Sequence, residues 1–145
     1  MMRSIRLVSA LMLISVMLFL AGLHVYWALG GKWGTFAAVP TIEGRRTINP
    51  TPLATSVVAF LLVVGAVAIC ARVGMFATGA WSAWFGFASW CLCGVFLLRA
   101  IGNRQTFGLF KAVHGTPFSH WDTLLYSPLS LVLGVLAAIG ASGRD

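Results

Sequence analysis

The side chains that could do chemistry lie where long apolar runs end. His24 could serve as a general acid or base with Asp122 orienting its imidazole, an arrangement suited to an enzyme acting on a lipid-like substrate. Near lipid, an unpaired carboxylate is costly, so we expect Asp122 to pair with Arg99, Lys111 or a histidine, or to accept from the backbone N–H groups that begin its helix. The candidate polar site comprises His24, Tyr26, Trp27, Arg99, Lys111, Asp122 and Tyr126.

The same residues also have a purely structural interpretation. Tyr26 and Trp27 are typical of an aromatic belt at a membrane surface, where the nearby histidine could face headgroups. Arg99 could extend to the headgroups or pair with an acidic residue to fix the loops. Asp122 could cap the helix that follows it. No catalytic residue is therefore assigned, and whether the protein is an enzyme stays open.

Several functional classes lack their motifs. The histidines and Asp122 match no standard zinc spacing, and histidines at one edge of the spans do not suit a buried haem. No GxSxG elbow is present, and no span carries a central acidic residue for proton coupling. The three cysteines form no CxxC motif and are expected to act as small hydrophobes. No cofactor and no metal ion are predicted.

The composition indicates a membrane protein. Of 145 residues, 59% are hydrophobic and 9% are charged, with a mean hydropathy of +0.93, whereas a soluble domain carries about 25% charged residues. The net charge is +7, from ten Lys and Arg against three Asp and Glu. These basic residues flank apolar runs, where they meet anionic headgroups, and form no stripe interleaved with aromatics. We therefore expect the lipid bilayer, and not nucleic acid, as a partner.

Four apolar runs are long enough to cross a bilayer: residues 7–29, 53–71, 81–101 and 123–141. The first run exceeds the apolar region of a signal peptide, so we expect it to be retained. Thr51 and Pro52 are typical of a helix start, and Pro128 predicts a kink in the fourth span. The predicted fold class is all-α, an integral membrane four-helix bundle that forms a single domain over residues 1–145.

Small residues recur along one face of the third and fourth spans, at Ser82, Gly86, Ser89 and Cys93, and at Ser130 and Gly134. Small side chains let neighbouring helices approach closely. We therefore expect both faces to be helix contacts, with Leu97 and Leu131 facing lipid instead.

Connectivity gathers the polar residues at one membrane face. With four spans, the loop at residues 30–51 (loop 1) and the loop at residues 102–121 (loop 3) lie on the same side, opposite the termini. All seven residues of the candidate site belong to this loop 1/loop 3 face. Two polar loops on one face are thus part of the predicted fold.

Two stretches on this face resemble a known family. The first is HVYWALGGKWG at residues 24–34, and the second follows the pattern RxxGxxxxFGLFKxVxGTxFxxxDTxxYSPL from Arg99 onward. Together they resemble a family of small bacterial four-helix integral membrane proteins, domain-of-unknown-function family 3995. The resemblance covers essentially the whole chain and implies a bacterial inner-membrane setting. It implies no reaction, substrate or cofactor.

These observations favour a multi-pass protein of the inner (plasma) membrane with a binding role. A lipid-like ligand or a membrane protein partner would bind on the loop 1/loop 3 face. The alternative is a small membrane-embedded enzyme acting on a lipid-like substrate, through His24 and Asp122. A transporter or channel subunit is the third choice, because no charge lies mid-span.

Reporter fusions at Arg72 and Asp145 should report the same side of the membrane, because four spans return the chain to its starting side. The positive-inside rule compares four basic residues on the terminal face with six on the loop face. Because Arg3 and Arg6 come first in the chain, we expect both termini to lie on the inner side of the membrane. Fusions that report opposite sides would contradict the four-span topology.

Overall fold

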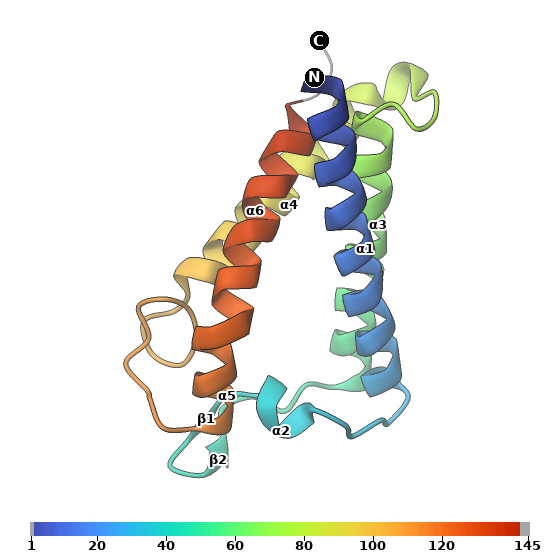
Figure 1. Ribbon diagram of the computed structural model, residues 1–145. Helices are drawn as coiled ribbons and strands as arrows, with labels where there is room; N and C mark the ends of the chain where they lie inside the picture. The colour runs from blue at the N-terminus through green and yellow to red at the C-terminus, as the bar shows by residue number, and fades with distance from the viewer. Residues whose placement is uncertain (1, 143–145) are drawn as a thin grey trace.

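The computed structural model describes residues 2–142, and its regular structure is almost entirely helical (Figure 1). The fusion site Asp145 lies outside the described residues. The long helices are α1 (Met2–Ala28), α3 (Pro52–Arg72) and α4 (Ser82–Ile101), the last preceded by the 3-10 turn η1 (Gly79–Trp81). A fourth helical rod is built from α5 (Pro117–Trp121), the π-helical turn η2 (Asp122–Tyr126) and α6 (Ser127–Ala141).

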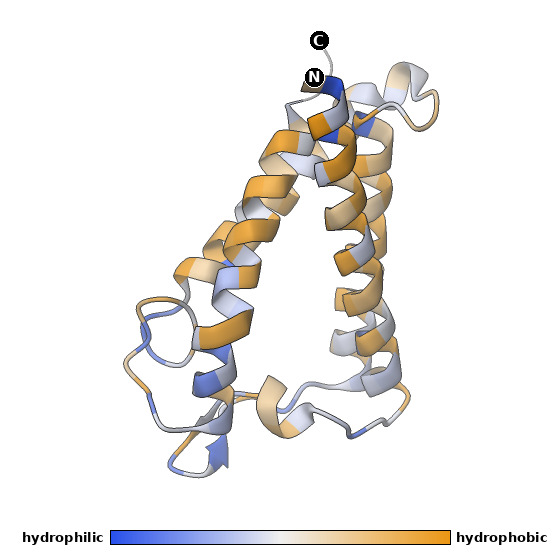
Figure 2. Cartoon of the chain, in the orientation of Figure 1, coloured by the Kyte–Doolittle hydropathy of each residue, from blue (hydrophilic) through white to orange (hydrophobic). Residues whose placement is uncertain are grey.

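All four rods are long and apolar enough to cross a membrane, and residues 2–142 contain no further rod of this kind. Apolar residues cover their length and hydrophilic ones concentrate at the two ends (Figure 2). The predicted all-α four-helix class is therefore confirmed.

The bundle consists of two helix pairs that meet toward one end. α1 packs mainly on α3, and α4 mainly on α6. The core between the pairs includes Leu13, Met17, Ile69, Phe96 and Leu133. α1 begins and α6 ends at this same end, and the pairs diverge toward loops 1 and 3 (Figure 1). The polar site is therefore at the end where the pairs are farthest apart.

Local chemistry explains where the helices begin and end. Thr51 caps α3 as predicted, because its Oγ1 accepts a hydrogen bond from the N–H of Ala54 at 3.1 Å. After α3, Gly74 has a φ of 80° and Met75 donates its N–H to the carbonyl of Cys70 at 3.0 Å. This closes the helix in a Schellman motif, for which glycine is suited because it has no Cβ.

The fourth rod begins six residues before the predicted start at residue 123. Thr116 is its N-cap and accepts from the N–H of Ser119 at 3.0 Å, and Pro117 occupies the first turn. The predicted cap at Asp122 is wrong, because Asp122 lies in the second turn, where its side chain is free to bond elsewhere.

Loop 1 contains a small β-hairpin that the apolar pattern did not reveal. Strands β1 (Thr41–Ile42) and β2 (Arg45–Arg46) pair antiparallel. Both residues of the turn between them, Glu43 and Gly44, have positive φ, as a type I′ turn requires. The short helix α2 (Thr35–Ala38), also in loop 1, contacts α5 and so joins the two halves of the loop 1/loop 3 face.

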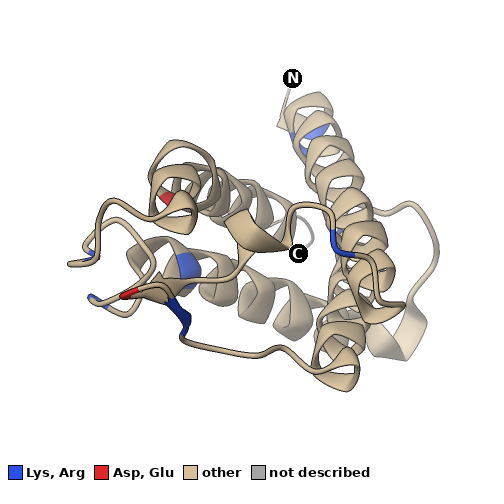
Figure 3. Cartoon of the chain, turned by 90° about the horizontal axis from the view of Figure 1, so that it is seen from below, with Lys and Arg blue, Asp and Glu red and all other residues tan. Residues whose placement is uncertain are grey.

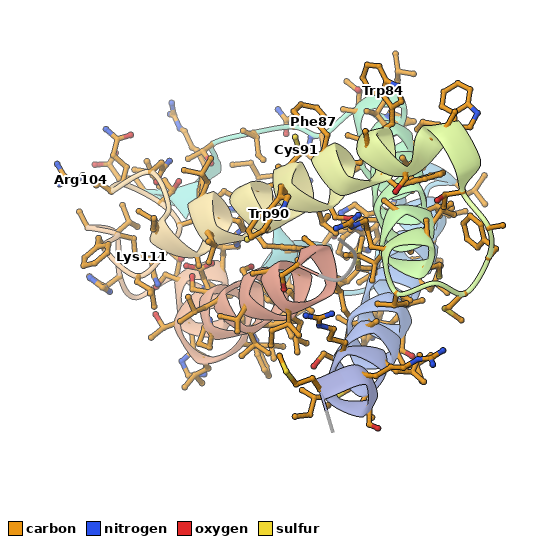
Figure 4. The ribbon with its side chains drawn as sticks, turned by 90° about the horizontal axis from the view of Figure 1, so that it is seen from above. Trp84, Phe87, Trp90, Cys91, Arg104 and Lys111 are labelled. Atoms are coloured by element: carbon orange, nitrogen blue, oxygen red, sulfur yellow. The ribbon has the colours of Figure 1, made fainter. Side chains whose placement is uncertain are left out.

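The small-residue faces are contacts, as predicted. Ser89 and Cys93 are buried on α4, and a Cβ at Gly134 would lie 2.7 Å from the Leu97 side chain. The prediction that Leu97 faces lipid is therefore wrong, because it fills the space that Gly134 leaves. Leu131 is 43% exposed. The outer surface of α4 instead carries Trp84, Phe87 and Trp90, which are all exposed (Figure 4).

The Gly134→Leu variant should be less stable than the wild type by about 1–3 kcal/mol, because the larger side chain overlaps Leu97 and forces α4 and α6 apart. Gly94→Leu is the matched control, since a Cβ at Gly94 meets no atom within 4 Å. Thermal unfolding in detergent measures both. Equal shifts of the two midpoints would show that the α4–α6 contact does not depend on this glycine.

Candidate functional site

Asp122 is the centre of the polar end, and its side chain is fully buried. Its Oδ1 accepts from Nη2 of Arg99 at 2.8 Å. Its Oδ2 lies 3.0 Å from Nζ of Lys111 and accepts from the Gly108 N–H at 2.8 Å and from the Ser127 hydroxyl at 3.1 Å. Four donors from α4, loop 3 and α6 thus converge on one carboxylate. We call these five residues the Asp122 cluster.

Lys111 is also buried, with 3% of its side chain exposed. Besides facing the carboxylate, its ammonium donates to Oγ1 of Thr123 at 2.7 Å and to the carbonyl of Gly108 at 3.3 Å. A lysine ammonium has three protons, so each has a partner. This saturation allows a charged lysine to be buried next to lipid.

Arg99 is held less completely. Its guanidinium lies over the ring of Phe107, 4.9 Å from the ring centroid, and donates to Asp122 through Nη2. Nη1 is buried and has no hydrogen-bond partner within residues 2–142. With two cations to one carboxylate, the Asp122 cluster carries a formal charge of +1.

A crossing of two glycines positions the N–H of Gly108. Gly102 and Gly108 both have positive φ, and their backbones lie in close contact. A Cβ on either glycine would collide with the backbone at the other one. Asn103 stabilises the turn between them, because its Oδ1 accepts from the N–H groups of Gln105 and Thr106 at 3.0 and 2.8 Å. Loop 3 thereby brings its backbone to the carboxylate.

The π-helical turn positions Ser127. In η2 the N–H of Ser127 bonds to the carbonyl of Asp122, five residues earlier, so the two residues are neighbours on the rod surface. In an α-helix, neighbours are three or four residues apart. The turn precedes Pro128, which lacks an N–H and crowds the preceding turn. The sequence predicts a kink at Pro128, and what the structure has there is a π-turn that ends two residues before the proline.

His24 belongs to a different group of contacts. Its Nδ1 donates to the carbonyl of Leu20 at 2.8 Å, and its ring stacks edge-on against Trp27 with centroids 5.2 Å apart. Asp122 accepts hydrogen bonds from Arg99 and the other members of its cluster, whereas the Nδ1 of His24 bonds within α1. The two candidates lie on one face but on different helix pairs.

Tyr26 and Trp27 tie the start of loop 1 to the end of α1. The indole Nε1 of Trp27 donates to the carbonyl of Trp33 at 2.8 Å, and the N–H of Trp33 donates to the Tyr26 hydroxyl at 3.3 Å. Tyr26 also packs on Gly31, where any side chain would collide with the phenol ring. These contacts give the aromatic residues a structural role in the fold of loop 1.

Of the seven candidates, the structure brings together Arg99, Lys111 and Asp122. Tyr126, the remaining candidate, packs against Phe118 with the ring planes tilted by 45° and the centroids 6.0 Å apart. The candidate list omitted three residues that contact the charged groups, namely Gly108, Thr123 and Ser127. All three are fixed positions of the family-like sequence pattern that begins at Arg99, and that pattern could have identified them.

A concave surface lies beside the Asp122 cluster on loop 3 and α5. We call it the loop 3 groove, and it is lined by residues 114–117, Ser119, His120, Trp121, Thr123 and Leu124. Basic residues are spread over the segments around this end of the molecule (Figure 3). Within residues 2–142, no group of three His, Cys, Asp or Glu side chains is arranged to hold a metal ion.

Four apolar rods with two polar loops at one end define a multi-pass membrane protein. The sequence model of the family described as "Protein of unknown function (DUF3995)" matches residues 17–137, and the chain belongs to this family. The resemblance seen in the sequence is thereby confirmed. No curated protein and no solved structure matches the chain.

The Asp122→Asn variant should be destabilised by roughly 3 kcal/mol or more, because it leaves the buried ammonium of Lys111 without its counter-charge. His24→Gln should cost far less, since its bond is local to α1. We expect the two effects to add within about 0.5 kcal/mol, as for separate sites. Denaturation in detergent of both single variants and the double variant measures this, and a large coupling energy would refute the separation.

Proposed function

We propose that this chain is a ligand-binding module of the bacterial inner (plasma) membrane, and that a small amphipathic ligand binds in the loop 3 groove. The observation that carries the proposal is that Thr123 lines this groove and also accepts from the buried ammonium of Lys111 at 2.7 Å. The net positive charge of the Asp122 cluster favours an anionic or acceptor group there. Trp121 and Leu124 supply apolar surface for the rest of the ligand.

Binding is favoured over catalysis by the state of the two acid–base candidates. A general base needs a lone pair that the substrate can reach, whereas both oxygens of Asp122 already accept from protein donors. The Nδ1 of His24 is bonded within its own helix, and the donors to Asp122 come from its own cluster. These contacts give no support to an enzyme that uses this pair. The role of transporter is less favoured because no charged residue lies in the middle of a span.

The proposed location follows from the helical spans. Apolar helices of about 20 residues satisfy their own backbone hydrogen bonds in lipid, and the basic residues at both ends suit anionic headgroups. Co-fractionation of the tagged protein with inner-membrane vesicles is the direct check of this location.

Trp121→Ala should weaken binding of an anionic amphiphile at least about tenfold, equivalent to about 1.4 kcal/mol, because it removes an aromatic wall of the groove. Dodecyl phosphate is a suitable probe, titrated against the full chain in an uncharged detergent and followed by native mass spectrometry. Trp84→Ala is the matched control, since Trp84 is 66% exposed at the other end of the bundle.

Equal losses for the two tryptophan variants would contradict a site in the loop 3 groove. A different outcome is that a membrane protein co-purifies with the wild type in stoichiometric amount and is lost from the Trp121→Ala variant. In that case the groove would bind a membrane protein partner and not an amphipathic ligand.

A further inference from the structure

A second concave surface lies at the opposite end of the bundle, where the chain starts and finishes. It is bounded by the first turns of α1, the end of α3, residues 73–77 and Ser142, and we call it the terminal groove. Viewed from above, the start of α1, the end of α6 and the segment after α3 surround this region (Figure 4). None of the seven candidate residues lines it.

The terminal groove is strongly basic. Arg3, Arg6 and Arg72 line it, and no Asp or Glu is among its described lining residues. Arg3 and Arg6 are three residues apart on α1, so their side chains leave the same face of the helix. The guanidinium groups of Arg3 and Arg6 repel each other across this face, and a bound anion relieves that repulsion.

Arg72 gives this groove a fixed cation. Its Nε and Nη2 both donate to the carbonyl of Ala141, at 3.2 and 2.8 Å, and so join the end of α3 to the end of α6. Gly86 of α4 lies beside the same guanidinium, and a Cβ there would be 3.7 Å from its Cζ. These contacts with two other helices hold the positive charge of Arg72 at the edge of the groove.

The remaining wall of the groove is apolar and lies at the boundary of the membrane. Leu7, Met75 and Phe76 line it and are all exposed. Phe76 is held edge-on against Phe85, with ring centroids 6.1 Å apart. A basic concavity with an apolar wall at the end of four membrane spans matches the two parts of a phospholipid, a charged headgroup and an acyl chain.

We propose that the terminal groove binds an anionic phospholipid, with its phosphate between Arg3 and Arg6, near the positive charge of Arg72, and its acyl chain along Leu7 and Phe76. Guanidinium groups suit phosphate because their planar N–H donors match its oxygens in pairs. The bilayer supplies such lipids at the level of this groove. A soluble anion would instead have to reach the groove from water. This site is on the opposite face from the loop 3 groove and does not depend on the proposed function.

The test compares lipids that have the same acyl chains but an anionic or a zwitterionic headgroup. The full chain in an uncharged detergent is titrated with phosphatidylglycerol, phosphatidylcholine of the same acyl chains, or inorganic phosphate, and bound lipid is counted by native mass spectrometry. We expect phosphatidylglycerol to bind at least about tenfold more tightly than phosphatidylcholine. The double variant Arg3→Gln/Arg6→Gln should lose this preference, while Arg72 keeps its contact between α3 and α6.

The matched control is Arg45→Gln/Arg46→Gln, which removes the same charge from strand β2 on the opposite face and should leave binding unchanged. A loss as large in this control would show that net charge, not the groove, attracts the lipid. Equal binding of both lipids by the wild type, or inorganic phosphate that displaces phosphatidylglycerol at comparable concentration, would overturn the proposal.

Discussion

A carboxylate buried beside lipid must have all its hydrogen bonds within the protein, and the polar end of this bundle depends on that requirement. Asp122 meets it with donors from three segments that are distant in sequence: the end of α4, the middle of loop 3 and the start of α6. The crossing of Gly102 with Gly108 places the Gly108 N–H, and the π-turn places Ser127. The cluster therefore fixes loop 3 to the α4–α6 pair, and loss of the carboxylate would release all three segments together.

The division of the bundle into two pairs decides which polar residues can cooperate. The Asp122 cluster is built entirely from the α4–α6 half, whereas His24, Tyr26 and Trp27 bond among residues of α1 and loop 1. The short helix α2, through its contact with α5, links the two halves at this end. A shared membrane face therefore does not imply a shared site. The distance between helix pairs separates residues that connectivity alone places at the same depth.

The sequence predicted the features that follow from composition and from the cost of burial. The four spans follow from apolar length, and the pairing of Asp122 with Arg99 and Lys111 follows from the cost of an unpaired carboxylate near lipid. The crossing of Gly102 with Gly108 and the π-turn before Pro128 could not be predicted, because each depends on backbone angles that residue type permits but does not require. The start of the fourth helix was misplaced for a related reason, since Thr116 and Pro117 signal a start that the later apolar run obscured.

The two ends of the bundle use basic residues in opposite ways, and this difference bears on function. At the loop end, Lys111 is buried with every proton bonded, so its charge stabilises the fold and acts on a ligand only through the groove next to it. At the terminal end, Arg3 is exposed and lines an open concavity, so its charge is available to whatever binds there. A fully buried carboxylate that holds loop 3 to α4 and α6 cannot accept a proton from a substrate without disrupting these contacts. The two proposals therefore share one kind of chemistry, the recognition of anionic and amphipathic molecules by cations at the two ends of the bundle.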